Sequence, residues 1–106
     1  MNTSPRTVRL RAPDNWHAHF RDGPMLDFLV PVFLDAGWRR RIVAEPNITP
    51  PVLTGERALW YRDAILDRAR AHDPSTTVEP VMTIQITETT SGATVRDAHA
   101  KGVGIG

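Results

Sequence analysis

Residues 14–24 read DNWHAHFRDGP, and this stretch is the strongest indication in the sequence of both the fold and the chemistry. Its first half alternates apolar and polar side chains, which is typical of a β-strand, where residues two apart point to the same side. His17 and His19 therefore project together and can bind one metal ion, because neutral imidazole is a common zinc ligand. Arg21 shares that period and adds a positive charge on the same side. A surface strand with two solvated histidines is the plainer interpretation of the same pattern.

The residues that follow place the histidine pair at the end of its strand. Residues 21–24 contain Gly23 and Pro24 and are typical of a turn. A strand that stops directly after His19 presents both histidines at its carboxyl end. Active sites of parallel α/β barrels are built at that end of the sheet, so the context favours a functional site over two solvated side chains.

The composition is that of an ordinary globular domain of 106 residues, with 41% hydrophobic and 24% charged residues. The net charge of +1 gives no reason to expect binding to nucleic acid or to an anionic membrane. The sequence has no cysteine, so a metal site must use histidine, a carboxylate or a modified side chain. We expect neither a secretory signal nor a bilayer-spanning segment, and we expect a cytoplasmic protein.

The hydrophobic patterns predict strands that alternate with helices. Strands are expected at residues 15–19, 41–44, 77–86 and 103–106, with a further short strand at 7–10. Helices are expected at residues 25–36 and 90–101, and a third should run from an N-cap at Thr54 to about residue 70. Pro31 should kink the first helix or divide it. This order predicts an α/β fold with a parallel sheet and right-handed crossovers. It amounts to about half of an eight-stranded barrel, which needs about 250 residues.

Four segments resemble the dihydroorotase family of the amidohydrolase superfamily, in its homodimeric bacterial type. Residues 16–23, WHAHFRDG, resemble the signature of that family's first strand, and residues 45–52, EPNITPPV, resemble its second-strand loop with Pro-Asn and paired prolines. Residues 81–83 and 101–103 fit the third strand and the entry to the fourth. The similarity extends over nearly the whole sequence.

The resemblance implies a zinc enzyme that reversibly cyclises N-carbamoyl-L-aspartate to L-dihydroorotate in de novo pyrimidine (UMP) biosynthesis. Residues 1–106 would form a partial barrel domain, the N-terminal half of a (β/α)8 TIM-type barrel. His17 and His19 would bind the more buried of two zinc ions. Arg21 and Asn47 would bind the substrate carboxylate, for which arginine offers two parallel hydrogen bonds. The full-length enzyme would be a cytoplasmic homodimer that acts on this small molecule and has no nucleic-acid or membrane partner.

Two departures from the family pattern bear on function. Glu45 stands before Pro46 and Asn47 where the family usually has methionine, and an acid is unexpected beside a site for an anionic substrate unless it points away. The family's carbamylated lysine that bridges the zinc ions, its later zinc-binding histidines and its catalytic aspartate would lie beyond residue 106, and Lys101 is not placed to replace that lysine. We therefore expect no catalytic residue in this chain, weak metal binding and no turnover, as for an inactive fragment.

Two other functions fit the same residues. Another cyclic amidohydrolase, such as a hydantoinase or an allantoinase, shares the His-x-His strand, although Arg21 and Asn47 favour a substrate with a free carboxylate. A non-catalytic truncated module is the other alternative, because a half-barrel exposes sheet edges and an apolar face that invite association. Among the remaining residues, we expect Tyr61 in the core and consider Asp22 as a support for Arg21 or His19.

Overall fold

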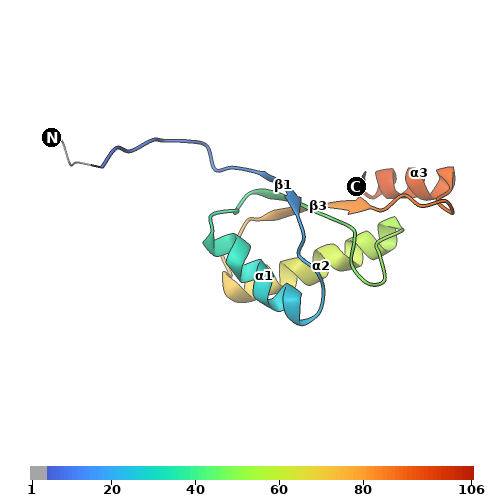
Figure 1. Cartoon of the computed structure of the whole chain (residues 1–106), viewed down its shortest axis with the longest axis horizontal. Helices are drawn as coiled ribbons and strands as arrows, with labels where there is room; N and C mark the ends of the chain where they lie inside the picture. The colour runs from blue at the N-terminus through green and yellow to red at the C-terminus, as the bar shows by residue number, and fades with distance from the viewer. Residues whose placement is uncertain (1–4) are drawn as a thin grey trace.

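The computed structural model describes residues 5–106, which form four parallel strands that alternate with three helices. The elements are β1 (Asn15–Ala18), α1 (Pro24–Asp35), β2 (Arg41–Ala44), α2 (Gly55–His72), β3 (Glu79–Ile84), α3 (Gly92–Ala100) and β4 (Gly104–Ile105). The strands lie in the order β1-β2-β3-β4, so each helix crosses over between neighbouring parallel strands. Figure 1 shows α1 and α2 on the same side of the strands and the N-terminal segment extending away from them. The predicted parallel α/β fold is confirmed.

The hydrophobic core lies between the sheet and the helices. Residues two apart on the central strands are buried, as the strand period requires: Ile42 and Ala44 on β2, and Met82 and Ile84 on β3. The buried residues of α1 fall four apart, and those of α2 fall three or four apart, as expected for one face of a helix: Leu26, Val30 and Leu34, then Ala58, Tyr61, Ile65 and Ala69. Full burial of a side chain such as Ile42 contributes about 1.5–3 kcal/mol.

The strand β1 carries an irregularity that places the two histidines. Asn15 pairs with Ile42 and Ala18 with Ala44, so four residues of β1 are matched by three of β2. Within this stretch, Asn15 Oδ1 accepts a hydrogen bond from the His17 backbone N–H at 3.0 Å. The ladder then resumes, because the Glu45 backbone N–H donates to Ala18 O at 2.9 Å. The chain segment of the histidines is thereby fixed beside the end of β2.

Local signals set the helix boundaries. Thr54 caps α2 as predicted, since its Oγ1 accepts from the Arg57 backbone N–H at 3.2 Å. Ser91 caps α3 in the same way, so this helix begins at Gly92 and is shorter than the predicted 90–101. The strand β3 is likewise shorter than the predicted 77–86. After α3, Gly102 adopts φ 74°, a left-handed conformation that suits glycine at a helix end.

The predicted strand at residues 7–10 is wrong, and one of the two effects predicted for Pro31 is excluded. Residues 7–10 form no strand; they lie in an exposed segment, and alternation alone does not make a strand without a neighbouring strand to bond. Pro31 does not divide α1, which continues as one helix of 12 residues. The amide that Pro31 lacks would have bonded the carbonyl of Asp27, and Asp27 is exposed, so water can solvate that carbonyl instead.

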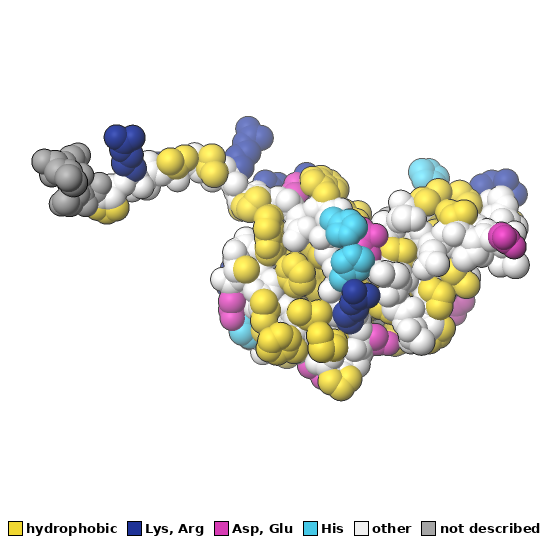
Figure 2. All heavy atoms as spheres, viewed as in Figure 1, with side chains coloured by type: hydrophobic (Ala, Val, Ile, Leu, Met, Phe, Trp, Pro, Cys, Tyr) yellow, Lys and Arg dark blue, Asp and Glu magenta, His cyan; other side chains and the backbone are white. Residues whose placement is uncertain are grey.

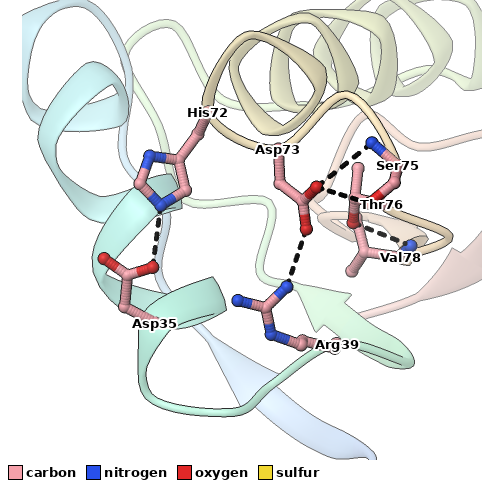
Figure 3. Close-up of polar contacts among 7 residues, drawn as sticks. All are labelled: Asp35, Arg39, His72, Asp73, Ser75, Thr76 and Val78. Atoms are coloured by element: carbon pink, nitrogen blue, oxygen red, sulfur yellow. Dashed lines mark hydrogen bonds and ion pairs between the residues drawn. The ribbon is translucent and has the colours of Figure 1, made fainter.

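Polar contacts tie the helix ends together at the edge of the sheet where β2 and β3 begin (Figure 3). His72 Nε2 lies 2.8 Å from Asp35 Oδ1, and Arg39 Nη1 donates to Asp73 Oδ2 at 2.8 Å. Asp73 also accepts from the backbone and side chain of Ser75. Hydrogen bonds from Ser75, followed by those from Arg39, hold the pKa of Asp73 below its usual value. This edge is opposite to the carboxyl ends of the strands, so we assign these contacts to stability.

None of the helices described in residues 5–106 combines the length and the hydropathy needed to cross a membrane.

Candidate metal and substrate site

The structure brings the side chains of His17 and His19 together at the carboxyl end of β1. Their Nε2 atoms are 2.9 Å apart, and their ring centroids are 4.8 Å apart. Figure 2 shows adjacent histidine rings on the visible face of the molecule, where they are open to solvent. The same-side orientation expected from the strand period is therefore present.

A polar side chain stands behind each ring, at hydrogen-bond distance for His19 and at ion-pair distance for His17. Asn47 Oδ1 lies 2.9 Å from His19 Nδ1, and Glu45 Oε1 lies 3.5 Å from His17 Nδ1. Both acceptors come from the segment that follows β2. Partners of this kind fix the tautomer and the orientation of metal-binding imidazoles.

These acceptors determine which nitrogen atoms are available to a metal. An amide oxygen can only accept, so His19 Nδ1 carries the proton and donates to Asn47, and His19 Nε2 presents a lone pair. In the metal-free chain, His17 Nε2–H can then donate the 2.9 Å hydrogen bond to His19 Nε2. A metal ion between the two Nε2 atoms would instead require the proton of His17 on Nδ1, which lies 3.5 Å from the Glu45 carboxylate.

The spacing of the two nitrogens nearly fits zinc. With Zn–N distances of about 2.0–2.1 Å and tetrahedral angles, two ligating nitrogens lie about 3.3 Å apart. The observed separation of 2.9 Å would have to open by only about 0.4 Å, which two side chains at the surface can accommodate. Within residues 5–106, however, no group of three or more His, Cys, Asp or Glu side chains is arranged to hold a metal ion. The described residues thus place two imidazole nitrogens at a spacing close to that of zinc ligands, without a third ligand of these types beside them.

Arg21 and Asn47 line one depression of about 400 Å³, together with Asp22, Gly23, Ile48 and Thr49. The side-chain period of β1 does not continue to Arg21, because this residue has φ 59° and lies in the turn before α1. The turn, rather than the strand period, brings Arg21 beside the loop that carries Asn47. The predicted carboxylate-binding pair therefore shares one open, polar surface.

Tyr61, predicted only as a core residue, also contacts the turn that carries Arg21. Its ring is fully buried in α2, as expected, and its hydroxyl donates to the backbone carbonyl of Arg21 at 2.6 Å. Burial raises the pKa of Tyr61 above its usual value, and the nearby charge of Asp22 raises it further. A buried tyrosine usually has a hydrogen-bond partner, so a tyrosine predicted in the core is also expected to form a hydrogen bond through its hydroxyl. This expectation could not identify Arg21 as that partner.

Two other residues are engaged away from the histidine pair. Asp22 Oδ1 accepts from the Gly23 backbone N–H at 2.7 Å, so its hydrogen bond stabilises the turn before α1 and is not made to Arg21 or His19. Lys101 pairs with the carboxylate of Asp97 at the end of α3. Since Lys101 precedes β4, it lies toward the opposite edge of the sheet from the histidines, in agreement with the expectation that it cannot serve their metal site.

Comparison with known proteins identifies one consistent group of relatives. No family model matches the sequence. Curated dihydroorotases match it along nearly its whole length: those of Marinobacter nauticus (41% identical, 92% of this chain), Shewanella frigidimarina (43%, 93%) and Cronobacter sakazakii (39%, 97%). The chain spans 27–28% of the length of these relatives.

Solved structures agree on the fold. A crystal structure of dihydroorotase from Saccharomyces cerevisiae, in complex with 5-fluoroorotic acid, matches with a TM-score of 0.68 at 22% identity, over 85% of this chain and 23% of that one. Dihydroorotase from Campylobacter jejuni matches with a TM-score of 0.67 at 23% identity, over 84% and 25%. The four parallel strands and three crossover helices fit the N-terminal half of the TIM barrel of these proteins. The chain therefore corresponds, in sequence and in fold, to the N-terminal portion of dihydroorotases.

Proposed function

We propose that residues 1–106 are the N-terminal part of an amidohydrolase barrel domain that catalyses the reversible cyclisation of N-carbamoyl-L-aspartate to L-dihydroorotate, in de novo pyrimidine biosynthesis. The observation that supports this function most strongly is the convergence of the two Nε2 atoms at 2.9 Å, with Asn47 Oδ1 hydrogen-bonded behind His19 and the Glu45 carboxylate 3.5 Å behind His17. The complete enzyme would be a cytoplasmic homodimer that binds a small anionic substrate.

In this proposal, His17 and His19 hold the more buried of two zinc ions. Bound zinc supplies a Lewis acid that polarises the amide carbonyl and lowers the pKa of water toward neutrality. A carbamylated lysine would bridge the two ions, and neither it nor the remaining ligands come from the described residues. The chain's own contribution is to fix two imidazoles in the tautomer that leaves Nε2 free.

Arg21 and Asn47 would bind the substrate carboxylate in the depression that they share. The guanidinium of Arg21 can form two parallel hydrogen bonds with a carboxylate. The amide of Asn47 can serve both partners in its present orientation, because Oδ1 accepts from His19 while Nδ2 can donate to the substrate. Metal ligand and substrate would thus be linked through one side chain.

A zinc titration of this chain by calorimetry, alongside turnover of dihydroorotate, tests the metal half of the proposal. We expect weak binding that is lost in His17→Ala and in His19→Ala, and no turnover, since the described residues provide only two ligands. Full-rate turnover by the 106-residue chain would contradict the proposal. So would zinc binding that survives both substitutions.

A chimera tests the substrate half. In it, this chain replaces the matching 99-residue portion of the Shewanella frigidimarina dihydroorotase. We expect dihydroorotase activity, and we expect Arg21→Met to raise KM about tenfold or more, since a charge-assisted hydrogen bond contributes about 1.5–3 kcal/mol. Arg40→Met, at the opposite edge of the sheet, is the matched control. An unchanged KM in the Arg21 variant would refute the assignment of the carboxylate-binding residue.

A further inference from the structure

We infer that Glu45 is a positioning residue for the metal site: its carboxylate holds His17 in the orientation and tautomer that direct Nε2 at the metal. This inference rests on the proposed zinc site and adds to it a residue at which this chain departs from the family pattern. A methionine at this position would have no oxygen acceptor to offer.

The surroundings of Glu45 indicate a specific contact and not a solvated surface acid. Its side chain is only 16% exposed, whereas the side chain of His17 is 71% exposed. A carboxylate that is largely shielded from water is costly unless a polar partner faces it. Within residues 5–106, the basic group that faces Glu45 is His17 Nδ1, at 3.5 Å, and the contact is an ion pair only when His17 is protonated.

The backbone fixes Glu45 at this position. Its N–H donates to Ala18 O at 2.9 Å, which extends the pairing of β1 and β2 by one residue. Ala18 is the residue between the two histidines, so Glu45 is anchored directly beside them. Pro46 follows, and its ring fixes the backbone φ at the next position. The carboxylate therefore faces His17 from a rigid support.

Glu45 acts behind the ring and not as a metal ligand. Its oxygen approaches Nδ1, while the nitrogen that meets His19 is Nε2, on the other side of the same imidazole. The two rings consequently have different supports: an anion behind His17 and a neutral amide behind His19. The inference therefore concerns the orientation and tautomer of His17, which Glu45 faces, and not those of His19.

The test compares zinc affinity in the wild-type chain with that in Glu45→Gln and Glu45→Met. Glutamine keeps the shape and an acceptor without the charge, and methionine removes the acceptor. Glu79→Gln, an exposed acid at the start of β3, controls for the loss of one negative charge. Thermal unfolding of the metal-free chains reports whether each variant folds, and His17→Ala gives the background binding. A second readout is the His17 Nδ1–H resonance in the zinc-loaded chain, assigned by its absence in His17→Ala.

We expect zinc to bind about tenfold or more weakly to Glu45→Met, with Glu45→Gln between it and wild type and the control unchanged. The Nδ1–H resonance should shift in the glutamine variant and broaden through solvent exchange in the methionine variant. Equal zinc affinity in wild type and Glu45→Met would overturn the inference while leaving the metal site intact. An unmoved Nδ1–H resonance would overturn it as well. If the wild-type titration matches that of His17→Ala, the proposed metal site itself is wrong and the inference falls with it.

Discussion

Replacing Tyr61 with phenylalanine tests the link between the core and the turn that carries Arg21. The substitution removes one hydroxyl and leaves the ring in place. The lost hydrogen bond, 2.6 Å from the hydroxyl to Arg21 O, is only partly buried, and Arg21 itself is exposed, so water can reach the carbonyl. We therefore expect a loss of about 1 kcal/mol, within the usual range for one hydrogen bond. In a domain of this size, that loss lowers Tm by roughly 4–8 °C.

The same variant makes a prediction about alkaline pH. The folded-state pKa of Tyr61 is raised above its ordinary value of 10.0, chiefly by burial. A raised pKa means that the folded state favours the protonated hydroxyl, so its stabilisation is fully present below pH 10 and is lost as the pH rises toward the folded-state pKa. Wild type should therefore lose stability above pH 10, and Tyr61→Phe should lack that component.

The chain offers a direct assay, because it contains one tyrosine. Tyrosinate absorbance of the wild type reports Tyr61 alone, and urea unfolding at pH 8 and at pH 11 gives the two stabilities. Trp60→Phe, which alters the exposed aromatic neighbour, should retain the alkaline loss. A tyrosine that titrates normally near pH 10 in the folded chain, or equal stability losses in wild type and Tyr61→Phe, would refute this reasoning.

Two further substitutions test the fold. Thr54→Ala removes the cap of α2 and should lower the free energy of unfolding, measured in urea, by about 1 kcal/mol. Thr77→Ala, at an exposed position, should change that free energy little. Equal effects of the two substitutions would contradict the capping role. Asp73→Asn removes a carboxylate whose pKa is lowered below 3.8 by hydrogen bonds from Ser75 and Arg39. A lowered pKa gives stabilisation that is present above pH 4 and lost on acidification, so the difference between wild type and Asp73→Asn should shrink from pH 7 to pH 2.5. A difference that is constant over this range would show that the carboxylate charge contributes nothing.

The element order was predictable because each strand and helix has its own period. The run Arg41–Ala44 is short, has three apolar residues after Arg41 and is closed by Pro46. Thr54 is a favoured cap residue. Both β2 and the start of α2 therefore appear in the structure where the sequence places them. The predictions that failed depend on the surroundings of a segment in the folded chain. Pro31 does not divide α1, and Asp27, whose carbonyl it leaves without a donor, is exposed.

The site was predictable only as far as local geometry extends. Residues two apart in a strand share a side, so the meeting of His17 and His19 followed from their spacing. The contact of Glu45 with His17 did not, because it depends on the register of β1 against β2, including the irregularity between Asn15 and Ala18. The position of Arg21 depends on a turn with positive φ, which no strand period describes.

The most direct test of the account is a crystal structure of the chain grown with Zn²⁺ and phased at the zinc absorption edge. We predict an anomalous peak about 2.0–2.1 Å from both His17 Nε2 and His19 Nε2, with Asn47 Oδ1 still bonded to His19 Nδ1. A zinc ion bound through Nδ1 of either ring, or bound to only one of the two histidines, would contradict it.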